Sequence, residues 1–283
     1  MRKVFLGVAV VLIAAVFFMG CGLLADDDTV IKVGHAPYDY EEPMIEVFVQ
    51  IAEEQGYTVD VVEGDIGFMF MSLAQGDIDV WPGIWLPSIH RSYHEERGDD
   101  YELGSAIFED APVGWAVPTY VEADSIADLV GNEDLVDGEL TGFEPGSGMM
   151  LVSEEIVEGY GLDLEVVPGS MASMMSEVEY ATQQEEPILF LGWRPHVMFR
   201  NYDIKMLEDP EGYWEQDDYF WGVAEGFDER APEMYRFVNN FKMSIDDTED
   251  FLYGYQEAGE DLSDLAAQWI EDNRSDIDAW LND

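Results

Sequence analysis

The sequence Ile78-Asp79-Val80-Trp81-Pro82-Gly83-Ile84-Trp85-Leu86-Pro87 begins as a β-rich segment and ends in a proline turn, with two tryptophans near its end. In open α/β sheets, ligands bind in loops at the carboxyl ends of the strands. We assign Trp81 to the core. Trp85 lies past the predicted strand, between Gly83 and Pro87, where a bulky ring is harder to bury, so we favour a ligand-binding face over a core position.

Predicted strands and helices alternate around this motif at the spacing of an α/β protein. In the first part of the chain, strands are predicted at Val30–Val33, Thr58–Val62 and Ile78–Trp81, and helices at Pro43–Gln55 and Gly67–Ala74. In the middle, strands are predicted at Gly114–Val117, Leu140–Phe143, Leu164–Val167 and Ile188–Leu191, and helices at Ser125–Leu129, Gly148–Tyr160 and Met171–Thr182. The last third predicts helices at Pro232–Phe241, Ile245–Glu257 and Leu262–Trp280, which would pack on the first sheet.

The length of the chain favours two lobes, because 283 residues exceed the usual size of a single domain, roughly 100–200 residues. Two proline-containing segments, 111–118 and 208–212, are candidate crossings between lobes. We therefore predict that residues 31–113 and 208–283 form lobe I and that residues 114–207 form an inserted lobe II.

The N-terminus has the layout of an export signal. Arg2 and Lys3 precede an apolar run, Val4–Met19, and a small residue, Gly20. Cys21, the only cysteine, lies where a bacterial lipoprotein receives lipid, and the sequence before it resembles a lipobox. We predict a signal peptide at 1–20 and a lipidated Cys21 with an acidic tether at 21–30; a plain signal peptide with an incidental cysteine is the alternative.

The composition is strongly acidic: 12 basic and 62 acidic residues give a net charge of −50, spread along the chain. Nucleic acid is excluded as a partner, because binding it requires a surplus of Lys and Arg on some face. Disorder does not fit the 8 Trp, 14 Tyr and 15 Phe. We predict a folded, halophilic protein whose self-repulsion is screened by molar salt, over about 3 Å, and which is poorly stable in dilute buffer.

A second motif, Phe190-Leu191-Gly192-Trp193-Arg194-Pro195-His196, again ends an apolar strand with Gly and Trp before a proline turn. An ordered set of motifs resembles the glycine betaine and choline substrate-binding proteins of ABC importers: Ile84-Trp85-Leu86-Pro87 with His90, Val117-Pro118-Thr119-Tyr120, Gly142-Phe143-Glu144-Pro145-Gly146-Ser147-Gly148, Gly192–Phe199, and Ala266-Ala267-Gln268-Trp269-Ile270 with Trp280. The resemblance covers nearly all of residues 30–283.

This resemblance implies a type II periplasmic-binding-protein fold, in which two α/β lobes close over a ligand in the cleft between them. It also implies that Trp85 and Trp193 are walls of an aromatic cage. Candidates for a third wall are Tyr38, from its loop position, and Trp221, whose apolar surroundings suit a core position equally well. The implied partners are a permease with its ATPase, at the outer face of the cytoplasmic membrane, and no cofactor is needed.

An aromatic cage suits a trimethylammonium group, which carries a positive charge but no N–H. A carboxylate gains no hydrogen bond from such a group, whereas each ring face contributes about 0.5–2 kcal/mol. The same chemistry leaves the ligand open between betaines, which we place first, and choline or carnitine.

Two segments are candidates for the ligand's polar end. In Tyr38–Pro43, relatives often have a Gly-Ile step where this chain has Glu41 and Glu42; with Asp39 nearby, these acids would repel a carboxylate unless they point to solvent, but would suit choline. The second is the turn before Gly148, where Ser147 is either a ligand donor or an ordinary helix cap, because helix starts bind anions and Ser is a preferred cap residue.

Other functional classes have little support. The four histidines do not have metal-ligand spacing with cysteine or clustered carboxylates, and we predict no metal site. Nucleophile-elbow, P-loop and Cys–His motifs are missing from the sequence, so we predict a receptor and not an enzyme. An extracellular enzyme acting on choline-like or sugar substrates and a sensory ectodomain are the rival hypotheses.

Overall fold

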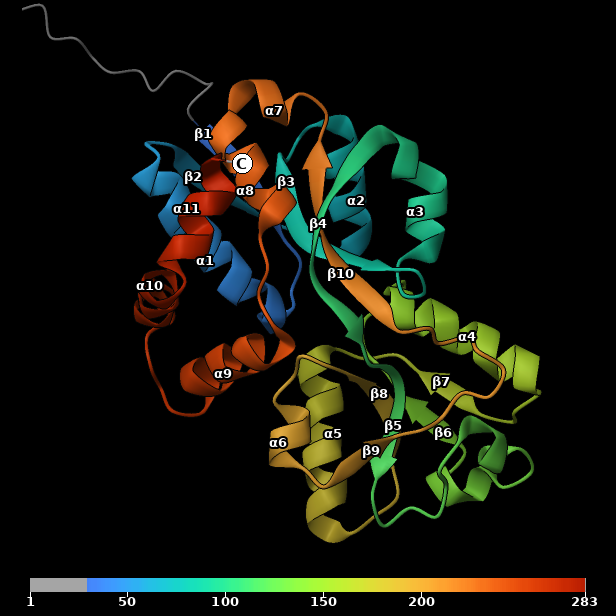
Figure 1. Cartoon of the computed structure of the whole chain (residues 1–283). Coiled ribbons are helices and arrows are strands. Elements are labelled where there is room, and N and C mark those ends of the chain that lie inside the picture. Colours follow the sequence, from blue (N-terminus) through green and yellow to red (C-terminus); the bar gives the residue numbers. More distant parts are fainter. Residues whose placement is uncertain (1–29, 283) are drawn as a thin grey trace, which may run out of the picture.

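The computed structural model describes residues 30–282, which form two α/β lobes (Figure 1). The predicted signal peptide, the lipidation site Cys21 and the acidic tether up to Thr29 lie outside the described residues. Within the described part, no helix combines the length and apolar character needed to cross a bilayer.

Lobe I contains a five-stranded sheet with the order β2-β1-β3-β10-β4. Its first segment comprises β1 (Val30–His35), α1 (Glu42–Glu54), β2 (Thr58–Glu63), α2 (Ile66–Gln75), β3 (Val80–Leu86), α3 (Arg91–Arg97) and β4 (Tyr101–Ala111). Its second segment comprises β10 (Asp217–Ala224), α7 (Phe227–Arg230), α8 (Pro232–Asn240), α9 (Ile245–Gln256), α10 (Leu262–Asp272) and α11 (Arg274–Asn282). Strands β2, β1 and β3 are parallel, and β10 is antiparallel to both β3 and β4.

Lobe II contains a second five-stranded sheet, with the order β7-β6-β8-β5-β9. It comprises β5 (Val113–Pro118), β6 (Glu139–Thr141), α4 (Gly148–Tyr160), β7 (Glu165–Val167), α5 (Met171–Gln184), β8 (Leu189–Trp193), α6 (Met198–Asn201) and β9 (Ile204–Met206). Strands β7, β6 and β8 are parallel, and β5 is antiparallel to β8 and β9. The two sheets therefore share one pattern, with β3 and β8 in equivalent positions.

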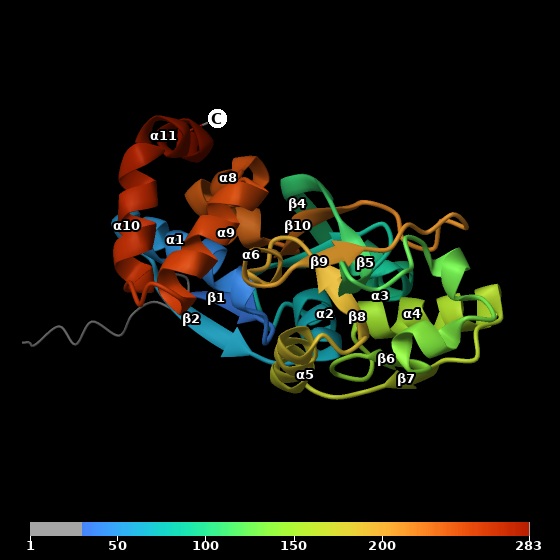
Figure 2. The same cartoon turned by 90° about the horizontal axis from the view of Figure 1, so that it is seen from below.

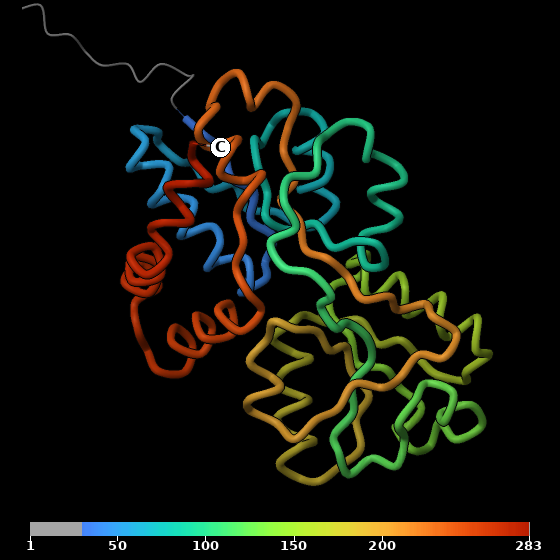
Figure 3. The backbone as a smooth tube through the Cα atoms, viewed as in Figure 1, coloured from blue at the N-terminus to red at the C-terminus, as the bar shows by residue number. Residues whose placement is uncertain are grey.

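The chain passes between the lobes twice (Figure 3). It enters lobe II at Pro112, between β4 and β5, and returns through residues 207–216, between β9 and β10. Two neighbouring crossings allow the lobes to move relative to each other, as in hinged binding proteins.

The C-terminal helices pack on lobe I, as expected from their apolar spacing (Figure 2). Helix α10 packs against α1, and α11 against α8, which in turn contacts β4 and β10. Helix α1 has Pro43 in its first turn, where the N–H that proline lacks would have no partner within the helix.

Some local expectations were wrong. The segment 262–280 is two helices, because the chain leaves helical geometry at Asn273, whose backbone N–H and side-chain amide both donate to the Trp269 carbonyl. The segment 125–129 is a single turn of 3₁₀-helix at Ile126–Leu129. Strands β4, β9 and β10 were missed; irregularities in the β4–β10 pairing disturb the alternation by which strands are recognised.

Trp221 is a core residue, which corrects its candidacy as a cage wall. Its ring is fully buried in lobe I and packs against Phe48 and Phe241, with centroids 5.4 Å and 5.9 Å away. On β10, Trp221 lies two residues after Tyr219, the residue that pairs with Trp85.

We expect Trp221→Ala to lower the free energy of unfolding by about 3–5 kcal/mol, because it leaves a large cavity. Chemical denaturation in molar salt measures this loss. The control is Tyr180→Ala, since that side chain is 59% exposed and should change stability by less than about 0.5 kcal/mol. Unchanged stability of the Trp221 variant would contradict the core assignment.

Candidate ligand-binding site

A small pocket lies between the lobes; its free volume is about 20 Å³, roughly the room of one water molecule, so its side chains nearly fill it. Lobe I contributes Tyr38, Tyr40, Trp85, Ile89 and His90 to its lining, and lobe II contributes Phe143, Ser147, Gly148, Met149 and Trp193. Among these lining residues there is no Lys, Arg, Asp or Glu. The pocket is thus largely aromatic, in a chain that is otherwise rich in carboxylates.

The two tryptophans lie at equivalent places in the two sheets. Trp85 is near the carboxyl end of β3, and Trp193 ends β8. Each is followed by one residue and a proline, at Pro87 and Pro195. Trp85 therefore belongs to the strand, not to a loop past it as expected, but it does line the pocket.

Tyr40 connects the two tryptophans. Its ring centroid lies 5.6 Å from that of Trp85 and 6.4 Å from that of Trp193, and both contacts are edge-to-face. The indole N–H of Trp85 donates to the Tyr40 hydroxyl over 3.2 Å. Because Trp85 and Trp193 belong to different lobes, this arrangement exists only when the lobes are close together.

Tyr38 and Phe143 form a further aromatic wall. Tyr38 stacks on Tyr40 at 5.5 Å and meets Phe143 of lobe II edge-to-face at 6.2 Å. Phe143 also contacts Trp193, at 5.6 Å. The structure thus brings Tyr38 to the same pocket as Trp85 and Trp193, together with Tyr40 and Phe143.

Ser147 precedes α4 and lines the pocket. It occupies the N-cap position, yet its hydroxyl makes no capping hydrogen bond and is buried without a partner among the described residues. The first N–H groups of a helix also lack partners within the helix. Ser147 and the start of α4 therefore present free donors to the pocket, which is the arrangement that suits an anion.

Gly148 lets lobe II approach lobe I at this point. A Cβ at Gly148 would collide with the backbone carbonyl of Ile89, which lines the pocket from lobe I. The glycine is therefore required by the close approach of the two backbones.

His90 is held as a neutral donor. The backbone N–H of Trp85 donates to Nδ1 of His90 over 3.1 Å, so the ring proton of His90 belongs on Nε2. Burial lowers the pKa of His90 to about 3. The turn before it is fixed by Asp217, which accepts from the N–H groups of Ser88 and Ile89 at 2.6 Å and 2.8 Å.

The acidic residues expected at the polar end do not line the pocket, which corrects that expectation. Asp39 accepts a hydrogen bond from Gln256 at 2.7 Å, and Glu42 is partly buried in the first turn of α1. Glu41 neither lines the pocket nor points to solvent, because it is fully buried behind the aromatic wall. None of the three therefore faces a ligand in the pocket directly.

Comparison with known proteins shows to which family the chain belongs. Residues 29–272 match the family described as the substrate-binding domain of ABC-type glycine betaine transport systems. The chain belongs to this family. It is a family of transport receptors and not of enzymes.

Solved structures and a curated relative agree with this membership. Lactococcal OpuAC, in a closed-liganded conformation complexed with glycine betaine, is 29% identical, with a TM-score of 0.84, over 90% of this chain and 100% of that chain. ProX of Borrelia burgdorferi is 26% identical, with a TM-score of 0.83, over 89% and 96%. The glycine betaine/carnitine transport binding protein GbuC of Listeria monocytogenes is 29% identical over 64% of this chain, and the match spans 59% of that protein's length.

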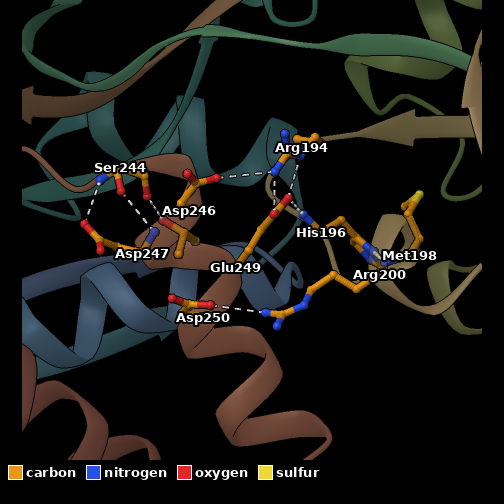
Figure 4. Close-up of polar contacts among 10 residues, drawn as sticks. Arg194, His196, Met198, Arg200, Ser244, Asp246, Asp247, Glu249 and Asp250 are labelled. Carbon is orange, nitrogen blue, oxygen red and sulfur yellow. Dashed lines mark hydrogen bonds and ion pairs between the residues drawn. The ribbon is translucent and has the colours of Figure 1, made fainter.

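An ion pair joins the lobes at Arg194, the residue that follows Trp193 in the sequence (Figure 4). Arg194 of lobe II donates from Nε and Nη2 to Glu249 of α9 in lobe I, at 2.8 Å and 2.6 Å. The Glu249 side chain is only 8% exposed, whereas that of Arg194 is 36% exposed. This bidentate pair raises the pKa of Arg194 and joins the two lobes beside the pocket.

Weaker contacts extend this pair along α9. Arg200 pairs with Asp250 at 3.2 Å, and Asn201 donates to Glu257 at 2.9 Å. Asp246 approaches Arg194 at 3.5 Å but is 90% exposed. The acidic face of α9 thus pairs with two of the three Lys and Arg residues of lobe II, whereas Lys205 pairs with Asp124 within lobe II.

We expect Glu249→Gln to favour the open form, because it removes the carboxylate from the bidentate pair. With solvent screening at Arg194, the loss is about 1–2 kcal/mol, or about 5- to 30-fold in the ratio of closed to open protein. Small-angle X-ray scattering measures this as a larger radius of gyration. Asp246→Asn is the control and should shift the ratio less than about twofold; equal effects of both variants would contradict the role of Glu249.

Proposed function

We propose that this chain captures glycine betaine or a related quaternary-ammonium compound and delivers it to the permease and ATPase of an ABC importer. The observation that carries the proposal is the aromatic pocket built from both lobes, with Trp85, Trp193 and Tyr40 at its centre. Family membership and the glycine betaine complex of lactococcal OpuAC support it. A ligand bound there contacts both lobes and so stabilises the closed form.

The ammonium end suits the ring faces. Three rings supply about 2–6 kcal/mol, at about 0.5–2 kcal/mol each. Micromolar binding requires about 8 kcal/mol, so contacts at the other end of the ligand must supply the rest. For a betaine, that end is a carboxylate.

The carboxylate end suits the donors at the start of α4. Ser147 offers an unpartnered hydroxyl, and Gly148 and Met149 begin the helix and line the pocket. His90, neutral with its proton on Nε2, is a further donor in the lining. These donors are uncharged, so they orient the carboxylate without competing with the ligand's own ammonium group. No chemical step or cofactor is part of this function.

The protein's place in the cell is part of the proposal. Substrate-binding proteins of ABC importers work outside the cytoplasm. Here the sequence 1–20 would direct export, and lipid on Cys21 would hold the receptor at the outer face of the cytoplasmic membrane. The net charge of −50 suits an environment of high salt.

Calorimetric titration in molar salt with glycine betaine, proline betaine, carnitine and choline tests the function. We expect saturable binding of at least one of them, and a loss of about 1–3 kcal/mol, or about 5- to 150-fold in Kd, for Trp85→Ala and for Trp193→Ala. Tyr180→Ala, on the exposed surface, is the matched control.

Two outcomes would count against this proposal. No binding of any of the four ligands would refute the quaternary-ammonium assignment. Unchanged affinity in both folded tryptophan variants would refute the cage.

A further inference from the structure

Glu41 is a fully buried carboxyl group directly behind the aromatic pocket. It follows Tyr40 at the end of a short 3₁₀ turn, Asp39–Glu41. Its Oε2 accepts from the backbone N–H of Ala36 at 2.8 Å and from the indole N–H of Trp81 at 3.2 Å. Its Oε1 is buried without a hydrogen-bond partner among the described residues.

No basic side chain forms an ion pair with Glu41 in the described part of the chain. A buried carboxylate without a cation is costly, so such groups either keep a proton or acquire a partner. Burial raises the pKa of Glu41, and the hydrogen bonds from Ala36 and Trp81 only partly oppose this. The group therefore lacks a counter-charge in the protein itself.

Among the ionisable groups around Glu41, the buried tyrosines and His90 are neutral near neutral pH, whereas Asp39 is exposed. Burial raises the pKa values of Tyr38 and Tyr40, on its own segment, and of Tyr219 from β10. His90, whose ring stacks on Trp81, stays neutral because burial lowers its pKa to about 3. Asp39, in the same turn, is bonded to Gln256. Glu41 is thus the buried group in this wall that can place a negative charge behind the Tyr40 ring.

We propose that Glu41 is the counter-charge of the ligand's ammonium group and makes the pocket prefer ligands with a net positive charge, such as choline, over zwitterions. This inference rests on the proposed function and names the ligand subclass that it favours. A cation beside Tyr40 would be attracted by the carboxylate through the low-dielectric ring layer. In a betaine, the ligand's own carboxylate is repelled by the same group, so part of this gain is lost.

Proton linkage follows from the same arrangement. A bound cation stabilises the ionised form of Glu41, so the pKa of Glu41 is lower in the complex than in the free protein. Binding therefore releases protons. The affinity for choline rises with pH over the interval between the two pKa values and is constant above the pKa of the free protein.

The test compares Glu41→Gln with the unmodified full chain in calorimetric titrations with choline and with glycine betaine, between about pH 5 and about pH 8. Gln keeps the oxygen that accepts from Ala36 and Trp81 but cannot ionise. We expect the ratio of choline affinity to glycine betaine affinity to fall on the order of tenfold, and the pH dependence of choline binding to disappear. Glu42→Gln, the neighbouring carboxylate outside the pocket lining, should change neither.

A second measurement does not depend on the variant. Titration of the unmodified protein with choline in two buffers of different ionisation enthalpy measures proton release, which we expect on binding. Absence of proton release, or a folded Glu41→Gln protein with an unchanged affinity ratio and pH profile, would overturn the role of Glu41 while leaving the proposed function intact. Failure of every ligand to bind the unmodified protein would overturn both.

Discussion

The contact of Tyr40, which packs on Trp85 in lobe I, with Trp193 across the cleft is the interaction on which the rest of the site depends. These rings come from both sheets and meet only when the lobes approach each other. Other features serve this approach: Gly148 permits the close passage of the two backbones, and Arg194 pairs with Glu249 directly beside Trp193. Aromatic faces, free helix-start donors and an inter-lobe ion pair thus lie together where the two lobes meet.

The inter-lobe contacts of this acidic chain differ in how strongly salt screens them. Exposed ion pairs such as Arg200–Asp250 weaken as the salt concentration rises, because salt screens them. The nearly buried carboxylate of Glu249 is screened less, and contacts between aromatic rings depend little on ionic strength. In high salt, therefore, the aromatic contacts and the Arg194–Glu249 pair carry most of the inter-lobe attraction.

Much of this fold could be predicted because local patterns specify it. The repeated order of apolar strand, tryptophan and proline drew attention to Trp85 and Trp193, which both line the pocket. Helix α4 begins and ends where its pattern predicts, at Gly148 and Tyr160. The polar turn before α4 likewise indicated Ser147. Such signals depend on neighbouring residues and can be read without knowing the tertiary structure.

The missed features depend on contacts that are distant in sequence. Tyr40 and Phe143 join the pocket only through the packing of opposite lobes, and Trp221 was placed in the core by Phe48 and Phe241. Acidic residues were expected to face the ligand or solvent, but the Ala36 N–H and the Trp81 indole hold Glu41 in the interior. Hydrogen bonds of this kind leave no periodic trace in the sequence.

The most direct measurement of the central claim compares glycine betaine with tert-butylacetate, which has the same shape and carboxylate but a carbon in place of the charged nitrogen. If ring faces select the positive charge, tert-butylacetate binds at least about 30-fold more weakly in calorimetric titration, from about 2 kcal/mol or more of lost cation–π attraction. Equal affinities would show that the pocket selects shape alone, and would contradict the account.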